Sequence, residues 1–236
     1  SSDDAQRAVD LLEADALQIH INSVQETVMP EGDRDFAAWP GAIEAIVQRV
    51  GVPVIVKEVG FGLSSKTLAR LAELGVSYAD VSGRGGTDFA RIENSRRRLG
   101  DYASLVGWGQ STPEALIEAD ASTSPTPVLL ASGGVRTPLD VLRALALGAR
   151  AVGVSGHFLE VLVEDGLEAL VEHIRSWQDH LAALQTMLGA PTPAALGQQE
   201  LILHGALLEF CASRGIDPAV VSRARGRGTL PSKGQR

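Results

Sequence analysis

A dense polar cluster follows the first buried segment of the chain. Residues 16–21 are mostly apolar, and His20, Asn22, Gln25 and Glu26 lie at or just beyond the end of this segment. Imidazole, amide and carboxylate groups can bind a metal ion or hydrogen-bond a ligand. The cluster is either a ligand site at the C-terminal end of a strand or a polar loop in which His20 and Asn22 cap a helix or satisfy backbone groups.

A lysine ends the second buried segment, which reads Val-Ile-Val-Lys over residues 54–57. A buried amine is costly unless it is paired or bound to an anion. Lys57 is therefore expected either to form an ion pair with Glu58 or another carboxylate, or to contact a bound cofactor or anion.

Glycine-rich segments follow three further apolar runs. Glycine lets the backbone approach a ligand closely, and free N–H groups at a helix N-terminus favour anions. The segment 82–87, Ser-Gly-Arg-Gly-Gly-Thr, is by itself equally typical of a tight turn with a helix-capping residue. Two of these segments, 132–138 and 153–156, follow successive strands. Together they favour a phosphate site over two ordinary turns. The candidate residues of this phosphate site are Gly133, Gly134, Val135, Arg136, Ser155 and Gly156.

Short apolar runs that position these residues alternate with amphipathic helical patterns. Runs that are apolar throughout predict strands buried on both faces, and hence a parallel sheet with helical crossovers. Thr137 is a plausible N-cap, and Gly75 and Gly148 follow two helices where a C-terminal glycine is expected. The expected strands are 16–21, 52–59, 78–81, 127–131 and 151–154, and the expected helices between them are 42–50, 65–74 and 138–147.

This alternation predicts an α/β fold of the (β/α)8 TIM-barrel type, of which about five C-terminal βα units lie in this chain. Residues 4–13 read as a helix, so either residues preceding Ser1 supply the other units or the chain forms an unusual open sheet. We expect the former, because a half-barrel would leave two apolar sheet edges unpaired. A long helical pattern over 158–188 is interrupted near Gly166. We expect residues 1–222 to be the C-terminal part of a single barrel domain with appended helices, and 223–236 to be a flexible basic tail.

Composition narrows the class of protein. The chain has 236 residues, 44% hydrophobic residues and a formal net charge of −8, which argues against a nucleic-acid groove. No apolar run reaches the roughly 18 residues of a membrane span, so we expect no membrane association. One cysteine excludes an internal disulfide and suits a reducing compartment, which predicts a cytoplasmic protein.

Taken together, the motifs resemble type 2 isopentenyl-diphosphate isomerase. They occur in the same order as in that family, at residues 17–26, 30–33, 54–62, 80–87, 131–136 and 153–158. The resemblance implies a flavin-dependent barrel, an isomerase of isoprenoid biosynthesis that interconverts isopentenyl and dimethylallyl diphosphate with no net redox change. It further implies reduced FMN, Mg²⁺, a reductant such as NADPH, a small diphosphate substrate and assembly into a homo-oligomer.

The resemblance also implies roles for individual residues. Gln25 would contact the substrate near the reacting alkene, with His20 and Asn22 lining the same pocket, and Glu26 would hold the Mg²⁺ that bridges to the diphosphate. Because an amide cannot act as a general acid, Gln25 would orient groups while the cofactor carries the proton chemistry. The expected FMN contacts are Lys57, Ser82 and Thr87, and the expected phosphate ligands are Gly133, Gly134, Val135, Arg136, Ser155 and Gly156.

Two other functions compete with this one. An FMN-dependent 2-hydroxy-acid oxidase or dehydrogenase carries its catalytic base in a His-Gly-Gly-Arg type of segment, whereas residues 82–87 contain no histidine. A non-catalytic barrel fragment acting in assembly is the third hypothesis, and the small number of strands favours it. FMN absorbance of the purified protein separates the two enzyme hypotheses from the fragment.

Overall fold

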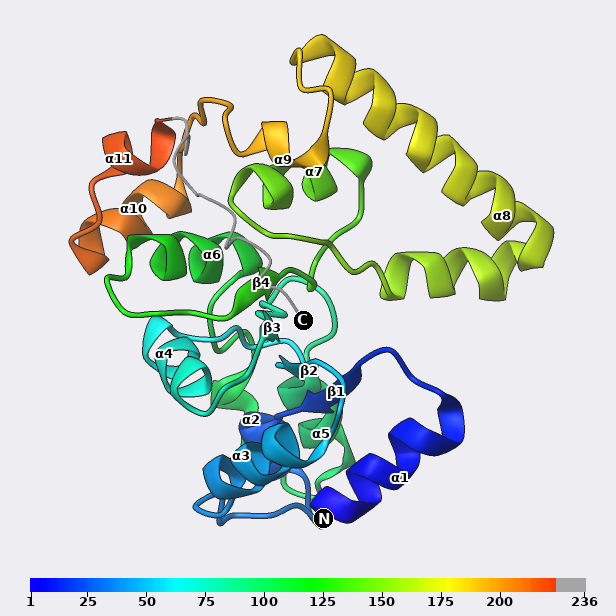
Figure 1. Ribbon diagram of the computed structural model, residues 1–236, viewed down its shortest axis with the longest axis vertical. Helices are drawn as coiled ribbons and strands as arrows, with labels where there is room; N and C mark the ends of the chain where they lie inside the picture. Colours follow the sequence, from blue (N-terminus) through cyan, green and yellow to red (C-terminus); the bar gives the residue numbers. More distant parts are fainter. Residues whose placement is uncertain (224–236) are drawn as a thin grey trace.

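A four-stranded parallel sheet forms the centre of the structure, a computed structural model that describes residues 1–223 (Figure 1). Its strands follow one another in chain order, and each pairs in parallel with the next. Parallel neighbours need a crossover, and helices supply each one. The strands are β1 (Leu17–His20), β2 (Val54–Lys57), β3 (Tyr78–Asp80) and β4 (Val128–Leu130).

The expected fifth strand at 151–154 forms only one bridge, in which Val152 pairs in parallel with Ala131 beyond the end of β4. Ala131 donates to the carbonyl of Ala151 and accepts from the N–H of Gly153. The prediction of a full strand was wrong, because pairing ends with this one bridge and a helix begins shortly afterwards at Gly156.

Helices flank the sheet and carry the chain between strands. The patterns predicted at 42–50, 65–74 and 138–147 are confirmed as α3, α4 and α7, and Thr137 caps α7 with a full capping box. The helices are α1 (Ser2–Leu12), α2 (Ser23–Val28), α3 (Trp39–Arg49), α4 (Ser65–Glu73), α5 (Phe89–Arg96), η1 (Ala103–Leu105), α6 (Thr112–Ala121), α7 (Pro138–Ala146), α8 (Gly156–Met187), α9 (Pro193–Leu196), α10 (Ala206–Arg214) and α11 (Pro218–Ser222).

The core lies between the sheet and the helices. Val56, Ala79 and Val81 are fully buried, as are Leu68 of α4 and Leu116 of α6. Parallel strands covered by helices bury apolar side chains on both faces, which explains their near-continuous apolar sequences.

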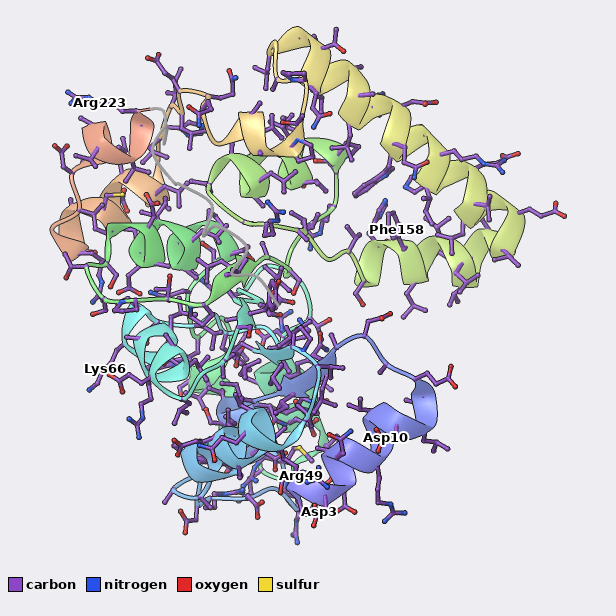
Figure 2. All side chains as sticks on the ribbon, in the orientation of Figure 1. Asp3, Asp10, Arg49, Lys66, Phe158 and Arg223 are labelled. Carbon is purple, nitrogen blue, oxygen red and sulfur yellow. The ribbon has the colours of Figure 1, made fainter. Side chains whose placement is uncertain are left out.

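Near the N-terminus of the chain, an ion pair joins two helices. Arg49 of α3 pairs with Asp3 of α1 at 3.1 Å (Figure 2).

The sheet is open in the part of the chain that the structure describes. There β1 pairs only with β2, and its residues alternate between half-buried and exposed. The predicted α/β class and parallel sheet are therefore confirmed, while the structure shows four strands and a bridge rather than a closed eight-stranded barrel. Residues 224–236, most of the expected tail, lie outside the described residues.

α8 is the longest helix and stands away from the sheet (Figure 1). Gly166 has non-helical backbone angles (φ 87°, ψ −179°) and divides α8 into two arms. The predicted interruption near Gly166 is thus confirmed. Among residues 1–223, no helix is long and apolar enough to cross a membrane.

Candidate functional site

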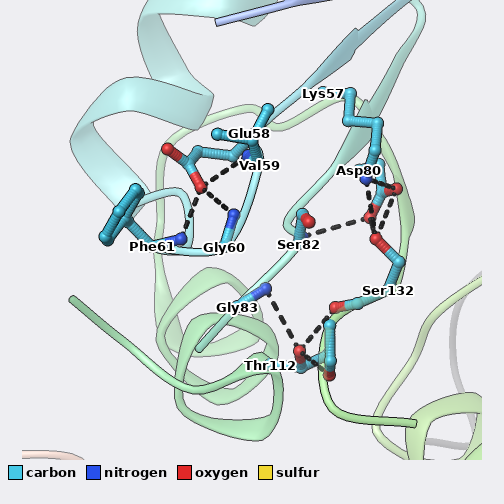
Figure 3. A network of polar contacts seen from close by, with 11 residues as sticks. Lys57, Glu58, Val59, Gly60, Phe61, Asp80, Ser82, Gly83, Thr112 and Ser132 are labelled. Atoms are coloured by element: carbon cyan, nitrogen blue, oxygen red, sulfur yellow. Dashed lines mark hydrogen bonds and ion pairs between the residues drawn. The ribbon is translucent and has the colours of Figure 1, made fainter. Parts of the chain in front are cut away.

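Polar side chains meet where the parallel strands end. Lys57 ends β2 and Asp80 ends β3, and the two are partners in the sheet register. Lys57 Nζ lies 2.9 Å from Asp80 Oδ2 and 2.9 Å from Ser132 Oγ, and Ser132 also donates to Asp80 (Figure 3). The amine therefore has both a carboxylate and a hydroxyl partner, which stabilises its charge in a half-buried place.

Glu58 lies on the other side of the strand end (Figure 3), because successive residues of a strand point to opposite faces. Its carboxylate accepts hydrogen bonds from the N–H groups of Val59, Gly60 and Phe61. Burial raises the pKa of Glu58 above its ordinary value of 4.5, although these N–H groups oppose the shift. Lys57 was expected to pair with Glu58 or with another carboxylate. Its partner in the structure is Asp80 and not Glu58.

The two glycine-rich loops pack directly against each other. Gly133 has φ 91°, and a Cβ there would lie 2.0 Å from the carbonyl oxygen of Gly83. The hydroxyl of Thr112 joins the loops, because it accepts from the N–H of Gly83 and lies 2.6 Å from the carbonyl oxygen of Ser132 (Figure 3). Glycine is required at Gly133 for both its conformation and this close approach.

A cavity of about 740 Å³ lies over these loops. Its volume falls within the roughly 300–1,000 Å³ typical of small-molecule and cofactor sites. In the described part of the chain, the N–H groups of Gly134 and Val135 donate to no protein acceptor, so they are available to an anion. The sequence-predicted residues that line it are Lys57, Thr87, Gly133, Gly134, Val135, Arg136, Ser155 and Gly156.

Arg136 reaches across this cavity wall to the other glycine-rich loop. Its guanidinium donates to the carbonyl of Gly85 at 3.1 Å, and its backbone N–H donates to Asp140. A guanidinium, free N–H groups and the hydroxyl of Ser155 are the donor types that bind phosphate in proteins. The residues present therefore fit a phosphorylated ligand such as FMN.

The first polar cluster lies beside this cavity and does not line it. His20 is exposed and pairs in register with Lys57, so both point to the same face of the sheet. Asn22 is buried and donates to Glu26 at 2.9 Å and to Gln25 at 3.4 Å. The amide of Asn22 thus ties Gln25 and Glu26 together.

Further contacts fix the two ends of this cluster. Glu26 accepts from the N–H of Asp33 at 3.0 Å, which closes the charged loop after α2. Gln25 donates to Glu93 of α5 at 3.2 Å, and buried Glu93 also pairs with Arg96. The amide of Gln25 is therefore oriented by a carboxylate from a helix far away in sequence.

Three residues of the segment 82–87, Ser82, Arg84 and Gly85, lie outside the cavity lining. Ser82 is buried with φ 35°, and its N–H donates to Asp80 at 3.1 Å. The exposed Arg84 side chain points to α6, where it pairs with Glu114 at 3.4 Å. Of this segment, Gly83, Gly86 and Thr87 line the cavity.

Sequence reasoning missed three polar residues of this region: Asp80, Ser132 and Glu93. Asp80 carried a usable signal, because it ends the strand after the one that Lys57 ends, and adjacent parallel strands bring such residues together. Ser132 opens the glycine-rich loop at the next strand end. Glu93 carried no signal, since its contact with Gln25 depends on how α5 packs on α2.

The sequences of known proteins support the resemblance inferred from the motifs. The chain is 65% identical over 215 residues to an isopentenyl-diphosphate delta-isomerase of Streptomyces sp. (strain CL190), covering 91% of this chain and 58% of that protein. It is 64% identical over 217 residues to an isopentenyl-diphosphate delta-isomerase of Kitasatospora griseola, covering 92% and 59%. The resemblance seen in the motifs is thus confirmed, and the chain spans less than two thirds of the length of these relatives.

The fold has parallels among solved structures. (S)-Mandelate dehydrogenase of Pseudomonas putida aligns with a TM-score of 0.53 at 22% identity, over 70% of this chain and 41% of that one. Residues 5–203 match the family described as FMN-dependent dehydrogenase. That match covers most of the chain, and the chain therefore belongs to the FMN-dependent dehydrogenase family.

Proposed function

We propose that this chain is the flavin-binding part of an FMN-dependent isopentenyl-diphosphate isomerase, an enzyme of isoprenoid biosynthesis that interconverts isopentenyl and dimethylallyl diphosphate. The observation that carries the proposal is the 65% identity to the Streptomyces isopentenyl-diphosphate delta-isomerase over 91% of the chain. Because the chain spans 58% of that relative, the proposal concerns the activity of the whole protein. We place residues 1–222 in one flavin-binding domain.

FMN would occupy the cavity at the strand ends. Lys57 and Thr87 line it and would contact the flavin, while Arg136, Ser155 and the free N–H groups of Gly134 and Val135 would hold its phosphate. Gly133 and Gly156 line the same part of the cavity, and because they have no side chains they leave room there for the cofactor. For Ser82 the support is indirect, since it binds Asp80, which in turn holds the amine of Lys57.

The substrate would lie beside the flavin, over the first polar cluster. Bound reduced FMN would supply the proton that adds to the alkene and take up the one that leaves. His20 points to the same face of the sheet as Lys57, and Asn22 holds Gln25 next to Glu26. Gln25, oriented by Glu93, would position the alkene for this proton transfer.

Glu26 would bind Mg²⁺ together with the substrate diphosphate. In the described residues no group of three or more His, Cys, Asp or Glu side chains is placed to hold a metal by itself. That arrangement fits Mg²⁺, which commonly takes one or two carboxylates and completes its shell with water and substrate phosphates. Each oxygen of Glu26 accepts one hydrogen bond, from Asn22 and Asp33, and each keeps a lone pair for the metal.

The same proposal includes NADPH as the reductant that keeps FMN reduced, a cytoplasmic location and assembly into a homo-oligomer. These three parts rest on the resemblance to the isomerases, and the single cysteine of the chain suits a reducing compartment. Neither nucleic acid nor a membrane is proposed as a partner.

Oxidation of a 2-hydroxy acid is the competing enzyme function, because the family takes its name from FMN-dependent dehydrogenases. The segment 82–87 has no histidine to serve as the base that abstracts a proton from such a substrate. Mixing the oxidised FMN-loaded protein with 2-hydroxy acids under anaerobic conditions tests this directly. We expect no bleaching of the flavin spectrum, and rapid bleaching would favour the dehydrogenase over the isomerase.

A further inference from the structure

A cluster of aromatic and histidine side chains joins the two arms of α8. His157 and Phe158 lie on the first arm, and Figure 2 labels Phe158 there. His173 and Trp177 lie on the second arm, beyond the break at Gly166. Trp177 is only 6% exposed, stacks on His157 with ring centroids 5.5 Å apart, and meets Phe158 edge-on at 4.9 Å.

Close polar contacts inside the cluster hold the ring of His157 against the second arm of α8. Trp177 Nε1 is 2.9 Å from His173 Nε2, and an indole N–H can only donate. His157 Nε2 also lies 2.9 Å from His173 Nε2, so the ring of His157 is held at this nitrogen by the second arm.

With Nε2 against His173, Nδ1 is the ring nitrogen of His157 left for another partner. Nδ1 lies 3.9 Å from Glu160 Oε2, and His157 and Glu160 both line the large cavity. Arg136, Ser155 and Gly156 line it too, and these are the residues that would bind the FMN phosphate. An imidazole nitrogen is a hydrogen-bonding group, so the ring of His157 adds a further polar group to this part of the cavity wall.

We propose that His157 is an additional ligand of the FMN phosphate, and that His173 and Trp177 are positioning residues that set the orientation of its ring. The inference rests on the placement of FMN in the proposed function. Cofactor-phosphate recognition then depends on the second arm of α8, although the side chains of that arm contact the phosphate only through His157.

Comparing FMN with riboflavin isolates the phosphate, because the two flavins differ only in that group. We would strip the protein of flavin, titrate it with each flavin separately, and follow quenching of flavin fluorescence. His157→Phe keeps the stacked ring and removes both nitrogens. We expect its dissociation constant for FMN to rise about tenfold, as for loss of one charge-assisted hydrogen bond, with riboflavin affinity unchanged.

Trp177→Phe tests the positioning step, since it keeps the aromatic packing and removes the N–H that His173 accepts. We expect the FMN dissociation constant to rise about threefold with riboflavin again unchanged. His180→Phe, on the exposed face of α8, is the matched control and should change neither constant. Arg136→Ala should also lose FMN selectively and serves as the positive control.

Equal losses for FMN and riboflavin in His157→Phe would show a merely structural role and overturn the inference, as would no loss for either. Wild-type protein that binds FMN no more tightly than riboflavin would overturn it as well. Selective loss together with absent isomerase activity would refute the isomerisation and leave the role of His157 intact.

Discussion

The amine of Lys57 lies 2.9 Å from the carboxylate of Asp80, at paired ends of two neighbouring parallel strands. The side chains are 25% and 11% exposed, so the pair is partly shielded from water. Ser132, which opens the glycine-rich loop of the cavity, bonds to both of them. One ion pair thus links the floor of the cavity to the loop that would hold the cofactor.

Asp80→Asn should destabilise the fold because it leaves the charge of Lys57 without its carboxylate. We expect the free energy of unfolding to fall by about 1–3 kcal/mol, less than for a fully buried pair. Chemical denaturation of the wild type and the variant measures this difference in unfolding free energy. Glu73→Gln removes the partner of Arg70 in an exposed pair of the same 2.9 Å length, and it should cost less than about 0.5 kcal/mol. Equal effects of the two substitutions would contradict a special role for the Lys57–Asp80 pair.

Gly133→Ala should damage the packing of the glycine-rich loops. Its φ of 91° is strained for alanine, and the added Cβ would meet the carbonyl of Gly83. We expect a loss of at least about 2 kcal/mol in unfolding free energy together with weaker FMN binding. In Gly41→Ala, within α3, the new Cβ has nothing within 4 Å, and stability should stay level or rise slightly. A harmless Gly133→Ala would disprove the close loop contact.

Stability should depend on pH through Glu58. Burial raises the pKa of Glu58 in the folded state above 4.5, so the folded protein binds this proton more tightly than the unfolded chain does. The resulting stabilisation is fully present below pH 4.5 and is lost as pH rises through the raised pKa. Unfolding free energies measured across this window should therefore fall less steeply with rising pH in Glu58→Gln than in the wild type. Identical slopes in the two proteins would refute the shift.

Glu26→Gln should weaken the response to Mg²⁺ while FMN stays bound, because one carboxylate is the only proposed protein ligand of the metal. We expect turnover to need roughly tenfold more Mg²⁺, with an unchanged flavin spectrum. Glu44→Gln, an exposed change in α3, is the control. Unchanged turnover at limiting Mg²⁺ would remove Glu26 from the metal site.

The sequence predicted the parallel sheet because β2 and its neighbours are apolar on both faces. It predicted the cavity loops because glycine is needed wherever two backbones touch, as at Gly133. It did not predict α6, since nearly every residue from Thr112 to Ala119 is buried and no amphipathic stripe shows in such a helix.

Individual partners were harder to predict than elements. That Lys57 needs a carboxylate followed from the cost of burying an amine, but the choice of Asp80 over Glu58 depends on strand register and on which face each side chain takes. The contact between Gln25 and Glu93 depends on helix packing, and the histidine pair of α8 depends on the turn at Gly166. Such contacts between residues distant in sequence leave no local pattern.

The most direct test of the proposed function is to incubate the whole protein with isopentenyl diphosphate, reduced FMN and Mg²⁺ and to follow the products by NMR. The proposal predicts dimethylallyl diphosphate in many-fold excess over flavin, without consumption of reductant in proportion to product, and the same equilibrium mixture from either isomer. Flavin that stays bound and reduced while neither isomer converts would contradict it.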